Sequence, residues 1–205
     1  MLFVRHATTP GTRAARFPAD EDADAASLAR ATALALAART PARETAGTAD
    51  AMPGPMGFTG VTTAWTAPVR AARQTAAALG LAAYETAALG EADCGRWRGL
   101  PYERIAREEP DALALWLADP DVAPHGGEPL TAHAARVARW LDSVREAPEG
   151  VAVCGVGTIR AALAHALGLG PFGAARFDLA PLSTTRLTAT RDGWRIAHVN
   201  RRIQS

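Results

Sequence analysis

Short apolar runs alternate along the chain with stretches of helical spacing, and turn-forming residues separate them. The apolar runs predict strands over residues 1–6, 61–65, 84–89, 151–154, 176–179, 184–190 and 194–199. Apolar residues at helical spacing predict helices over residues 25–39, 66–79, 101–108, 110–117, 130–147 and 158–167. Alternating strands and helices indicate an α/β sandwich, in which ligands bind at the carboxyl ends of the strands.

Length and charge narrow the class of protein further. The 205 residues are enough for one well-buried domain and too few to need two. Hydrophobic residues make up 48% of the chain and the net charge is +1, which excludes a disordered polyelectrolyte and a strongly basic nucleic-acid binder. We therefore expect a small-molecule ligand as the partner, and neither nucleic acid nor a membrane; the oligomeric state is not predicted.

All 22 basic residues are arginines. Schiff-base chemistry and a phosphate loop of the Walker type both need a lysine, so both are excluded. The two cysteines, Cys94 and Cys154, are too few for a disulfide scaffold, and no Cys/His spacing predicts a zinc site. We expect no metal, no cofactor and a cytoplasmic location, because Met1 leads into a short apolar run without the pattern of a signal peptide or a membrane span.

The first predicted strand delivers an Arg-His pair. The segment Phe3-Val4-Arg5-His6-Ala7 places both polar side chains at the end of the strand. A neutral imidazole is a nucleophile and a guanidinium binds phosphate oxygens bidentately, so this pair is typical of phosphoryl transfer. An isolated pair of this kind is equally compatible with a histidine that only hydrogen-bonds the backbone at a strand end.

Further motifs follow the pair in a fixed order: Arg16-Phe17, Pro68 with Gln74-Thr75-Ala76, Glu91 with residues 95–99, Gly126-Gly127-Glu128, and Thr158-Ile159-Arg160. Together they resemble the histidine phosphatase superfamily, the clan of cofactor-independent phosphoglycerate mutases and α-ribazole phosphatases. The resemblance implies one three-layer α/β/α domain over residues 1–205 around a mostly parallel sheet. It also implies lid insertions around residues 41–60 and 100–127.

The resemblance also implies roles for individual residues. His6 matches the nucleophile that forms a phosphohistidine, and Arg5 and Arg16 match arginines that hold the phosphate. Glu91 matches the acidic residue that protonates the leaving oxygen and then activates water. Thr12 stands where an asparagine often completes the first loop of these proteins.

Two positions depart from the pattern of the superfamily. Ala71 stands where an arginine is expected, three residues after Pro68, and Gly155 stands where a second histidine is expected. Arg70 is adjacent to Ala71, but one residue along a helix is a rotation of about 100°, so we expect Arg70 to face away from the site. With Val156 beside Gly155, these positions predict an enlarged, less charged pocket.

Three functions follow as alternatives. In the leading one, ordinary phosphomonoesterase activity is weak or absent, and the pocket binds or transforms a small metabolite through His6/Glu91 acid-base chemistry. In the second, the protein is an active phosphatase on a small phosphorylated metabolite of the α-ribazole phosphate or sugar phosphate type, with a phospho-His6 intermediate. Arg70, Arg16 or Arg160 would then replace the missing groups. In the third, the protein binds its ligand without catalysis and His6 is a relic.

Overall fold

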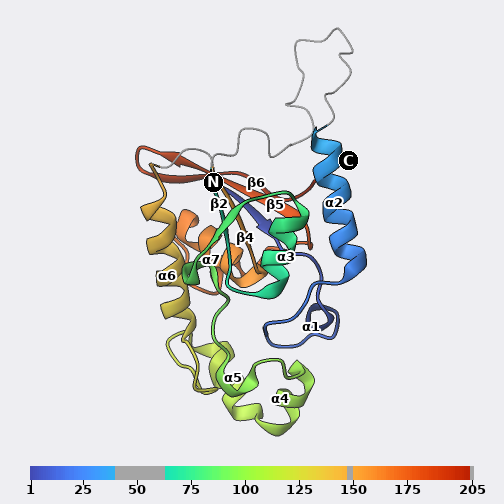
Figure 1. Ribbon diagram of the computed structural model, residues 1–205. Helices are drawn as coiled ribbons and strands as arrows, with labels where there is room; N and C mark the ends of the chain where they lie inside the picture. Colours follow the sequence, from blue (N-terminus) through green and yellow to red (C-terminus); the bar gives the residue numbers. More distant parts are fainter. Residues whose placement is uncertain (40–62, 147–149, 204–205) are drawn as a thin grey trace.

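A computed structural model describes residues 1–39, 63–146 and 150–203 of the chain (Figure 1). Its centre is a six-stranded sheet in the order β3-β2-β4-β1-β5-β6. The strands are β1 (Leu2–Arg5), β2 (Thr63–Thr66), β3 (Ala83–Glu85), β4 (Gly150–Cys154), β5 (Ser183–Thr190) and β6 (Gly193–Arg202). The first four are parallel, whereas β5 and β6 are antiparallel to their neighbours, so the predicted mostly parallel sheet is confirmed.

Helices cover both faces of the sheet. One pair is α2 (Ala25–Arg39) with α3 (Arg70–Ala78), and the other is α6 (Leu130–Ser143) with α7 (Val156–Leu167). Figure 1 shows the two pairs on opposite sides of the strands, which confirms the three-layer α/β/α architecture. Among the residues described, no helix is long and apolar enough to cross a lipid bilayer.

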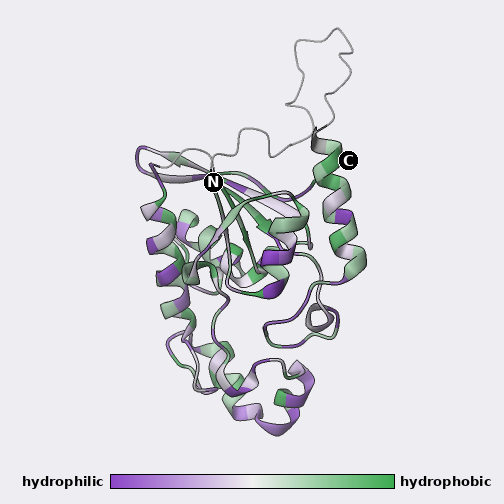
Figure 2. Cartoon of the chain, viewed as in Figure 1, coloured by the Kyte–Doolittle hydropathy of each residue, from purple (hydrophilic) through white to green (hydrophobic). Residues whose placement is uncertain are grey.

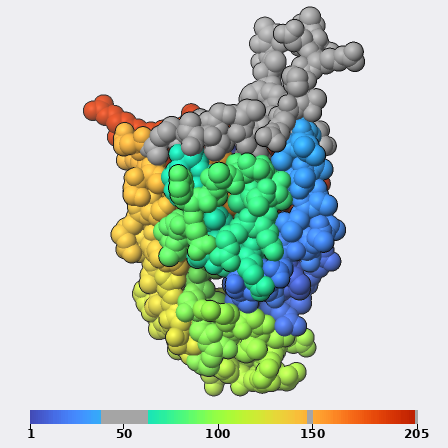
Figure 3. All heavy atoms as spheres, in the orientation of Figure 1, coloured from blue at the N-terminus to red at the C-terminus, as the bar shows by residue number. Residues whose placement is uncertain are grey.

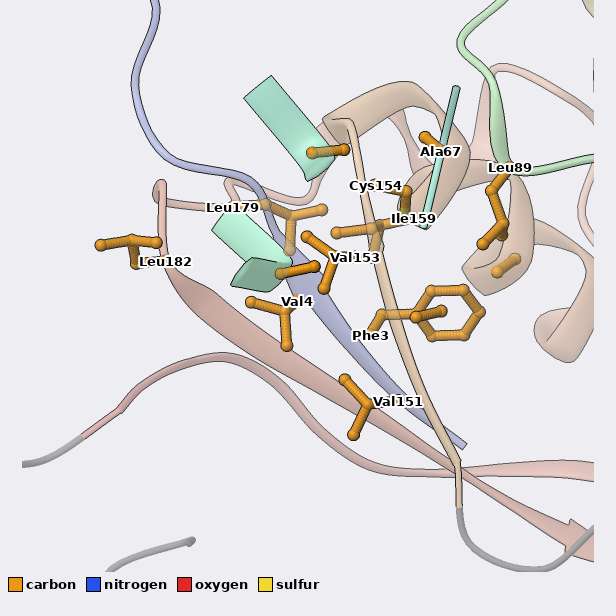
Figure 4. Close-up of a cluster of buried hydrophobic side chains, with 14 of the residues drawn as sticks. Phe3, Val4, Ala67, Leu89, Val151, Val153, Cys154, Ile159, Leu179 and Leu182 are labelled. Atoms are coloured by element: carbon orange, nitrogen blue, oxygen red, sulfur yellow. The ribbon is translucent and has the colours of Figure 1, made fainter. Parts of the chain in front are cut away.

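The core lies between the sheet and its helices. All five residues of β4 are buried, and Phe3 packs edge-on against Trp140 of α6 with ring centroids 6.2 Å apart. Figure 4 shows Val4, Val151 and other apolar side chains gathered around β1 and β4. Hydropathy follows this layout, with polar residues concentrated on the outer surfaces of α4 and α6 (Figure 2). The two central parallel strands are therefore held rigidly, and so are the residues at their carboxyl ends.

A smaller apolar cluster lies beyond those ends. It joins α4 (Tyr102–Glu108) and α5 (Pro110–Ala118) to the loop after β1, which contains the short helix α1 (Pro10–Arg13). Phe17 packs against Trp97 with centroids 5.2 Å apart, and its N–H donates to Leu100 O over 3.0 Å. In Figure 3 the blue loop lies directly against the yellow-green α4–α5 segment. The loop is thus fixed over the end of the sheet.

Several predicted elements differ from the observed ones. The predicted strand over 84–89 ends at Glu85 because Thr86 Oγ1 accepts a hydrogen bond from Ala88 N and starts the 3₁₀ turn η1 (Ala87–Leu89). The predicted strand over 176–179 is wrong. Its first residue ends the 3₁₀ turn η3 (Gly173–Arg176). The Phe177 carbonyl, which a strand would pair with a neighbouring strand, accepts hydrogen bonds from Arg160. The insertion predicted at 41–60 lies outside the described residues, and residues 100–127 contain α4 and α5.

Candidate active site

His6 follows β1 directly at the carboxyl end of the sheet. Its N–H donates to Cys154 O over 2.9 Å, and its Nδ1 lies 2.8 Å from Ala7 O. Because a carbonyl only accepts, Nδ1 carries the proton of the neutral ring and Nε2 keeps its lone pair. Burial lowers the pKa of His6 below its ordinary value of 6.5, although the Ala7 carbonyl and the Glu91 charge raise it. At neutral pH His6 is therefore an unprotonated acceptor or nucleophile.

Helix α3 supports the segment after β1 and presents Ala71 to the site. Ala7 N donates to Thr75 Oγ1 over 2.9 Å, and that hydroxyl donates to Ala71 O over 2.6 Å. Arg70 points elsewhere: its Nη1 lies 3.0 Å from Asp22 Oδ2, and its Nη2 donates to Asp20 O over 2.6 Å. The expectation that Arg70 faces away from the position of Ala71 is confirmed.

Glu91 reaches the N-terminus of α7. Its Oε1 accepts a hydrogen bond from Gly157 N over 2.9 Å and another from Thr158 N over 3.3 Å. The first N–H groups of a helix have no partner within the helix and carry partial positive charge, so a carboxylate is stabilised there. Glu91 occupies donors that an anionic ligand would otherwise use.

The carboxylate of Glu91 fits because two glycines make room for it. A Cβ atom on Gly155 would lie 2.0 Å from Glu91 Oε1, and one on Gly157 would lie 2.4 Å from Oε2. Both distances are shorter than any van der Waals contact, so a side chain at position 155 and this position of Glu91 exclude each other. Gly155, one of the residues predicted to bind a ligand, thus acts by admitting Glu91.

The backbone that carries Glu91 is held by two side chains. Thr158 Oγ1 lies 3.1 Å from both Leu89 O and Gly90 O. Arg136 Nη1 donates to Gly90 O over 3.2 Å and also to the carbonyls of residues 87 and 88, while its Nε and Nη2 bind the Glu128 carboxylate. The partners of Arg136 come from distant segments of the chain and leave no local signal in the sequence.

A cavity of about 440 Å³ opens beside His6. Seven of the predicted site residues line it, namely Arg5, His6, Thr12, Arg16, Ala71, Glu91 and Val156. Gly155 is buried and does not line it. Three further carboxylates, Asp20, Glu21 and Asp93, and one further arginine, Arg98, were not predicted from the sequence. The cavity is therefore lined by both signs of charge.

The arginines that line the cavity, and Arg160 on α7, form hydrogen bonds with the protein itself. Arg5 Nη1 donates to Leu179 O, and Arg160 donates to Phe177 O from Nε over 3.1 Å and from Nη2 over 2.8 Å. Arg98 pairs with Asp93, with 2.7 Å between Nη2 and Oδ1. Exposed Arg16 donates from Nη1 to the Gly99 carbonyl over 3.3 Å.

Two further histidines, His125 and His133, are buried. His125 is 2% exposed and its ring packs against Trp97 with centroids 5.0 Å apart. His133 on α6 is 4% exposed, and its buried Nε2 has no hydrogen-bond partner among the residues that the structure describes. Within the described residues, no group of three or more His, Cys, Asp or Glu side chains is arranged to hold a metal ion.

Replacing Arg136 tests how the Glu91 segment is held. Arg136→Gln removes the guanidinium from three carbonyls and from Glu128, and we expect it to lower the free energy of unfolding by about 1–3 kcal/mol. Arg139→Gln, on the exposed face of the same helix, serves as the matched control and should change it by less than about 0.5 kcal/mol. Chemical denaturation measures both. Equal effects of the two substitutions would contradict this role.

His133 predicts acid sensitivity. Burial lowers its pKa from 6.5, although Glu91 raises it, so the unfolded chain binds a proton more readily than the folded one. Stability is therefore lost as the pH falls below 6.5, by at most about 1.4 kcal/mol per pH unit for one group. His133→Leu should lose less stability than the wild type between pH 6.5 and 5, measured by denaturation at each pH. An unchanged pH slope would argue against this.

The chain is similar to known proteins in sequence and in fold. The family model described as "Histidine phosphatase superfamily (branch 1)" matches residues 1–202. A mycobacterial glucosyl-3-phosphoglycerate phosphatase, solved in complex with VO3, superposes with a TM-score of 0.78 at 23% identity over 98% of each chain. A putative α-ribazole-5'-P phosphatase from Escherichia coli gives 0.80 at 16% identity over 100% of this chain and 97% of its own. At such identities these two likenesses show the fold alone.

A curated relative is similar over a shorter stretch. A bifunctional protein of Mycobacterium tuberculosis is 35% identical over 65 residues, which are 32% of this chain and 18% of the relative. The chain thus spans about a fifth of the length of the curated relatives that it matches. The family model, by contrast, extends over almost the whole sequence. The chain belongs to branch 1 of the histidine phosphatase superfamily.

Proposed function

We propose that the His6 cavity does not act as an ordinary phosphomonoesterase site and instead binds, and transforms by His6/Glu91 acid-base chemistry, a small metabolite. The proposal rests on the position of the Glu91 carboxylate. Its carboxylate fills the space beside Gly155 and takes the N–H groups of α7. A phosphate dianion next to His6 would meet a negative charge at this end of the helix instead of a second imidazole.

The other side of the cavity supports the same proposal. Ala71 contributes a methyl group where the resemblance predicts an arginine, and Arg70 is bound to Asp20 and Asp22. An arginine aimed at a transferring phosphoryl group contributes about 10³–10⁵ in rate. Its loss leaves Arg5 and Arg16 as the cationic groups of the cavity that have no carboxylate partner in the described part of the chain.

His6 and Glu91 retain the chemistry for proton transfer. His6 Nε2 can accept a proton from a bound ligand, because the Ala7 carbonyl fixes the proton of the neutral ring on Nδ1. The Glu91 charge lies close enough to raise the pKa of His6, so it stabilises the imidazolium that such a step forms. Both groups line one cavity, and a polar ligand of a few hundred Å³ reaches both.

A second function, active phosphatase chemistry, is favoured by one observation. His6 lines the cavity, and its Nε2 carries the lone pair that the nucleophile of a phosphohistidine mechanism needs. The mycobacterial glucosyl-3-phosphoglycerate phosphatase and the α-ribazole-5'-P phosphatase share the fold, so a small phosphorylated metabolite is the substrate class of this alternative. The two functions differ in whether phosphate accumulates on His6.

The turnover of a panel of phosphomonoesters distinguishes the two functions. With an aryl phosphate and several sugar phosphates, we expect kcat/KM at least about 10³-fold below that of the mycobacterial phosphatase assayed in parallel, because the two cationic groups are missing. Mass spectrometry of the quenched reaction should find no phosphate on His6. Turnover close to that of the control enzyme, or a phosphorylated His6 peptide, would establish the phosphatase alternative.

Reintroducing the two missing side chains tests the physical reason. The double variant Ala71→Arg/Gly155→His should gain at least about 10²-fold in aryl phosphate hydrolysis, since it restores cations at the phosphate and expels Glu91 from its seat. Ala71→Met/Gly155→Asn is the matched control, because it adds side chains of more comparable size without adding charge. If the control gains as much as the charged variant, charge is not what the site lacks.

A further inference from the structure

His133 lies on the face of α6 that packs against the segment carrying Glu91. It is 4% exposed, and its buried Nε2 has no hydrogen-bond partner among the residues that the structure describes. The ring of His133 interacts with the Gly90 backbone, and Arg136, about one helical turn further along α6, donates to Gly90 O over 3.2 Å. Both side chains therefore contact the residue that precedes Glu91, although His133 is not among the described residues that line the His6 cavity.

Two carboxylates and one guanidinium act on the His133 ring. Burial lowers the pKa of His133, and the Glu91 charge raises it. The charges of Arg136 and Glu128 act in opposite directions, and these two groups are paired with 2.7 Å between Nη2 and Oε2, so their effects largely cancel. His165, a titratable residue of the adjoining helix α7, binds the last turn of α6 instead. Glu91 is therefore the carboxylate that can compensate a proton on His133.

The same carboxylate acts on His6. Burial lowers the pKa of His6, the Ala7 carbonyl and the Glu91 charge raise it, and Arg5 lowers it. The thiol of Cys154, whose carbonyl binds the His6 N–H, stays protonated because burial raises its pKa well above the ordinary value. One carboxylate thus acts on two imidazoles, one that lines the cavity and one that belongs to α6.

We propose that His133 is the second imidazole of the site, a positioning residue that shares the charge of Glu91 with His6. One carboxylate carries one negative charge, so it compensates a proton on either ring but not on both. A proton on His133 therefore makes a proton on His6 less favourable, and the converse holds with the same free energy. A protonated His133 consequently keeps His6 neutral at a lower pH than Glu91 alone would. This inference rests on the proposed function, in which the Glu91 charge stabilises the His6 imidazolium, and adds a residue that sets its dependence on pH.

The ring titrations of both histidines test the proposal. The full-length protein, carrying isotope-labelled histidine, is titrated from about pH 8 to about pH 4.5 and followed by NMR, and the histidine variants assign the signals. Glu91→Gln should lower the titration midpoints of His6 and His133 by at least about 0.5 pH unit, because it removes the charge that both rings share. Glu103→Gln, at an exposed position on α4 outside the cavity, is the matched control and should change neither midpoint.

Replacing each ring in turn measures how strongly the two protons oppose each other. In His133→Asn and in His6→Asn, the remaining ring has Glu91 to itself. The ring that takes up its proton at the lower pH in the wild type should titrate at least about 0.3 pH unit higher in the variant that lacks the other ring. His165→Asn, beside the last turn of α6, is the control and should change neither midpoint. A purely structural role of His133 would leave both midpoints unchanged, and unfolding midpoints of all variants confirm that each protein is folded.

Three results would overturn the proposal. They are unchanged midpoints in both histidine variants, a Glu91→Gln variant that shifts only one of the two rings, and a ring of either histidine that stays neutral throughout the titration. Phosphatase turnover measured on the same preparation separates this inference from the proposed function. Opposed titrations together with rapid phosphate ester hydrolysis would refute the function and keep the role of His133, whereas independent titrations without turnover would do the reverse.

Discussion

The contact between the Glu91 carboxylate and the first turn of α7 fixes the site. The N–H groups of Gly157 and Thr158 bind the carboxylate, and the helix end gains an anion where its own donors lack partners. Hydrogen bonds of this charged kind contribute about 1.5–3 kcal/mol each. A ligand anion would have to replace Glu91 there before it gained anything from the helix.

The same contact links segments that follow two strands separated by β2 in the sheet. Glu91 belongs to the segment after β3, whereas α7 follows β4, and Thr158 and Arg136 bind the backbone of that segment from α7 and α6. His6 is tied to β4 through Cys154 O, so nucleophile and carboxylate share one rigid frame. Only a glycine at position 155 allows this frame, and the proposed change in the chemistry of the pocket depends on it.

Local patterns were sufficient for much of the fold. Helix α2 has the predicted bounds of residues 25–39, and the paired helices α4 and α5 were predicted to within one residue at each end, because prolines and apolar spacing mark them in the sequence. The motif that contains Gln74 and Thr75 also has a structural role, since Thr75 Oγ1 accepts a hydrogen bond from Ala7 N. The predicted strand over residues 176–179 failed because the side chain of Arg160, from another element, takes its carbonyl.

The sequence predicted most residues of the candidate site. It did not predict where their charged groups lie or which groups they contact. Sequence order and spacing pointed to His6 and Glu91 and to the small residues at 71 and 155, but contacts between distant segments decide where each carboxylate lies. Glu21 is seated by Gly11 and held by α3, and neither relation leaves a periodic signal.

A crystal structure of the protein soaked in vanadate tests whether the position of Glu91 excludes a phosphate-like anion. We expect Glu91 to remain bound to Gly157 N and no vanadium to lie within bonding distance of His6 Nε2. Vanadate bonded to His6, with Glu91 displaced and an arginine turned in from another position, would contradict it.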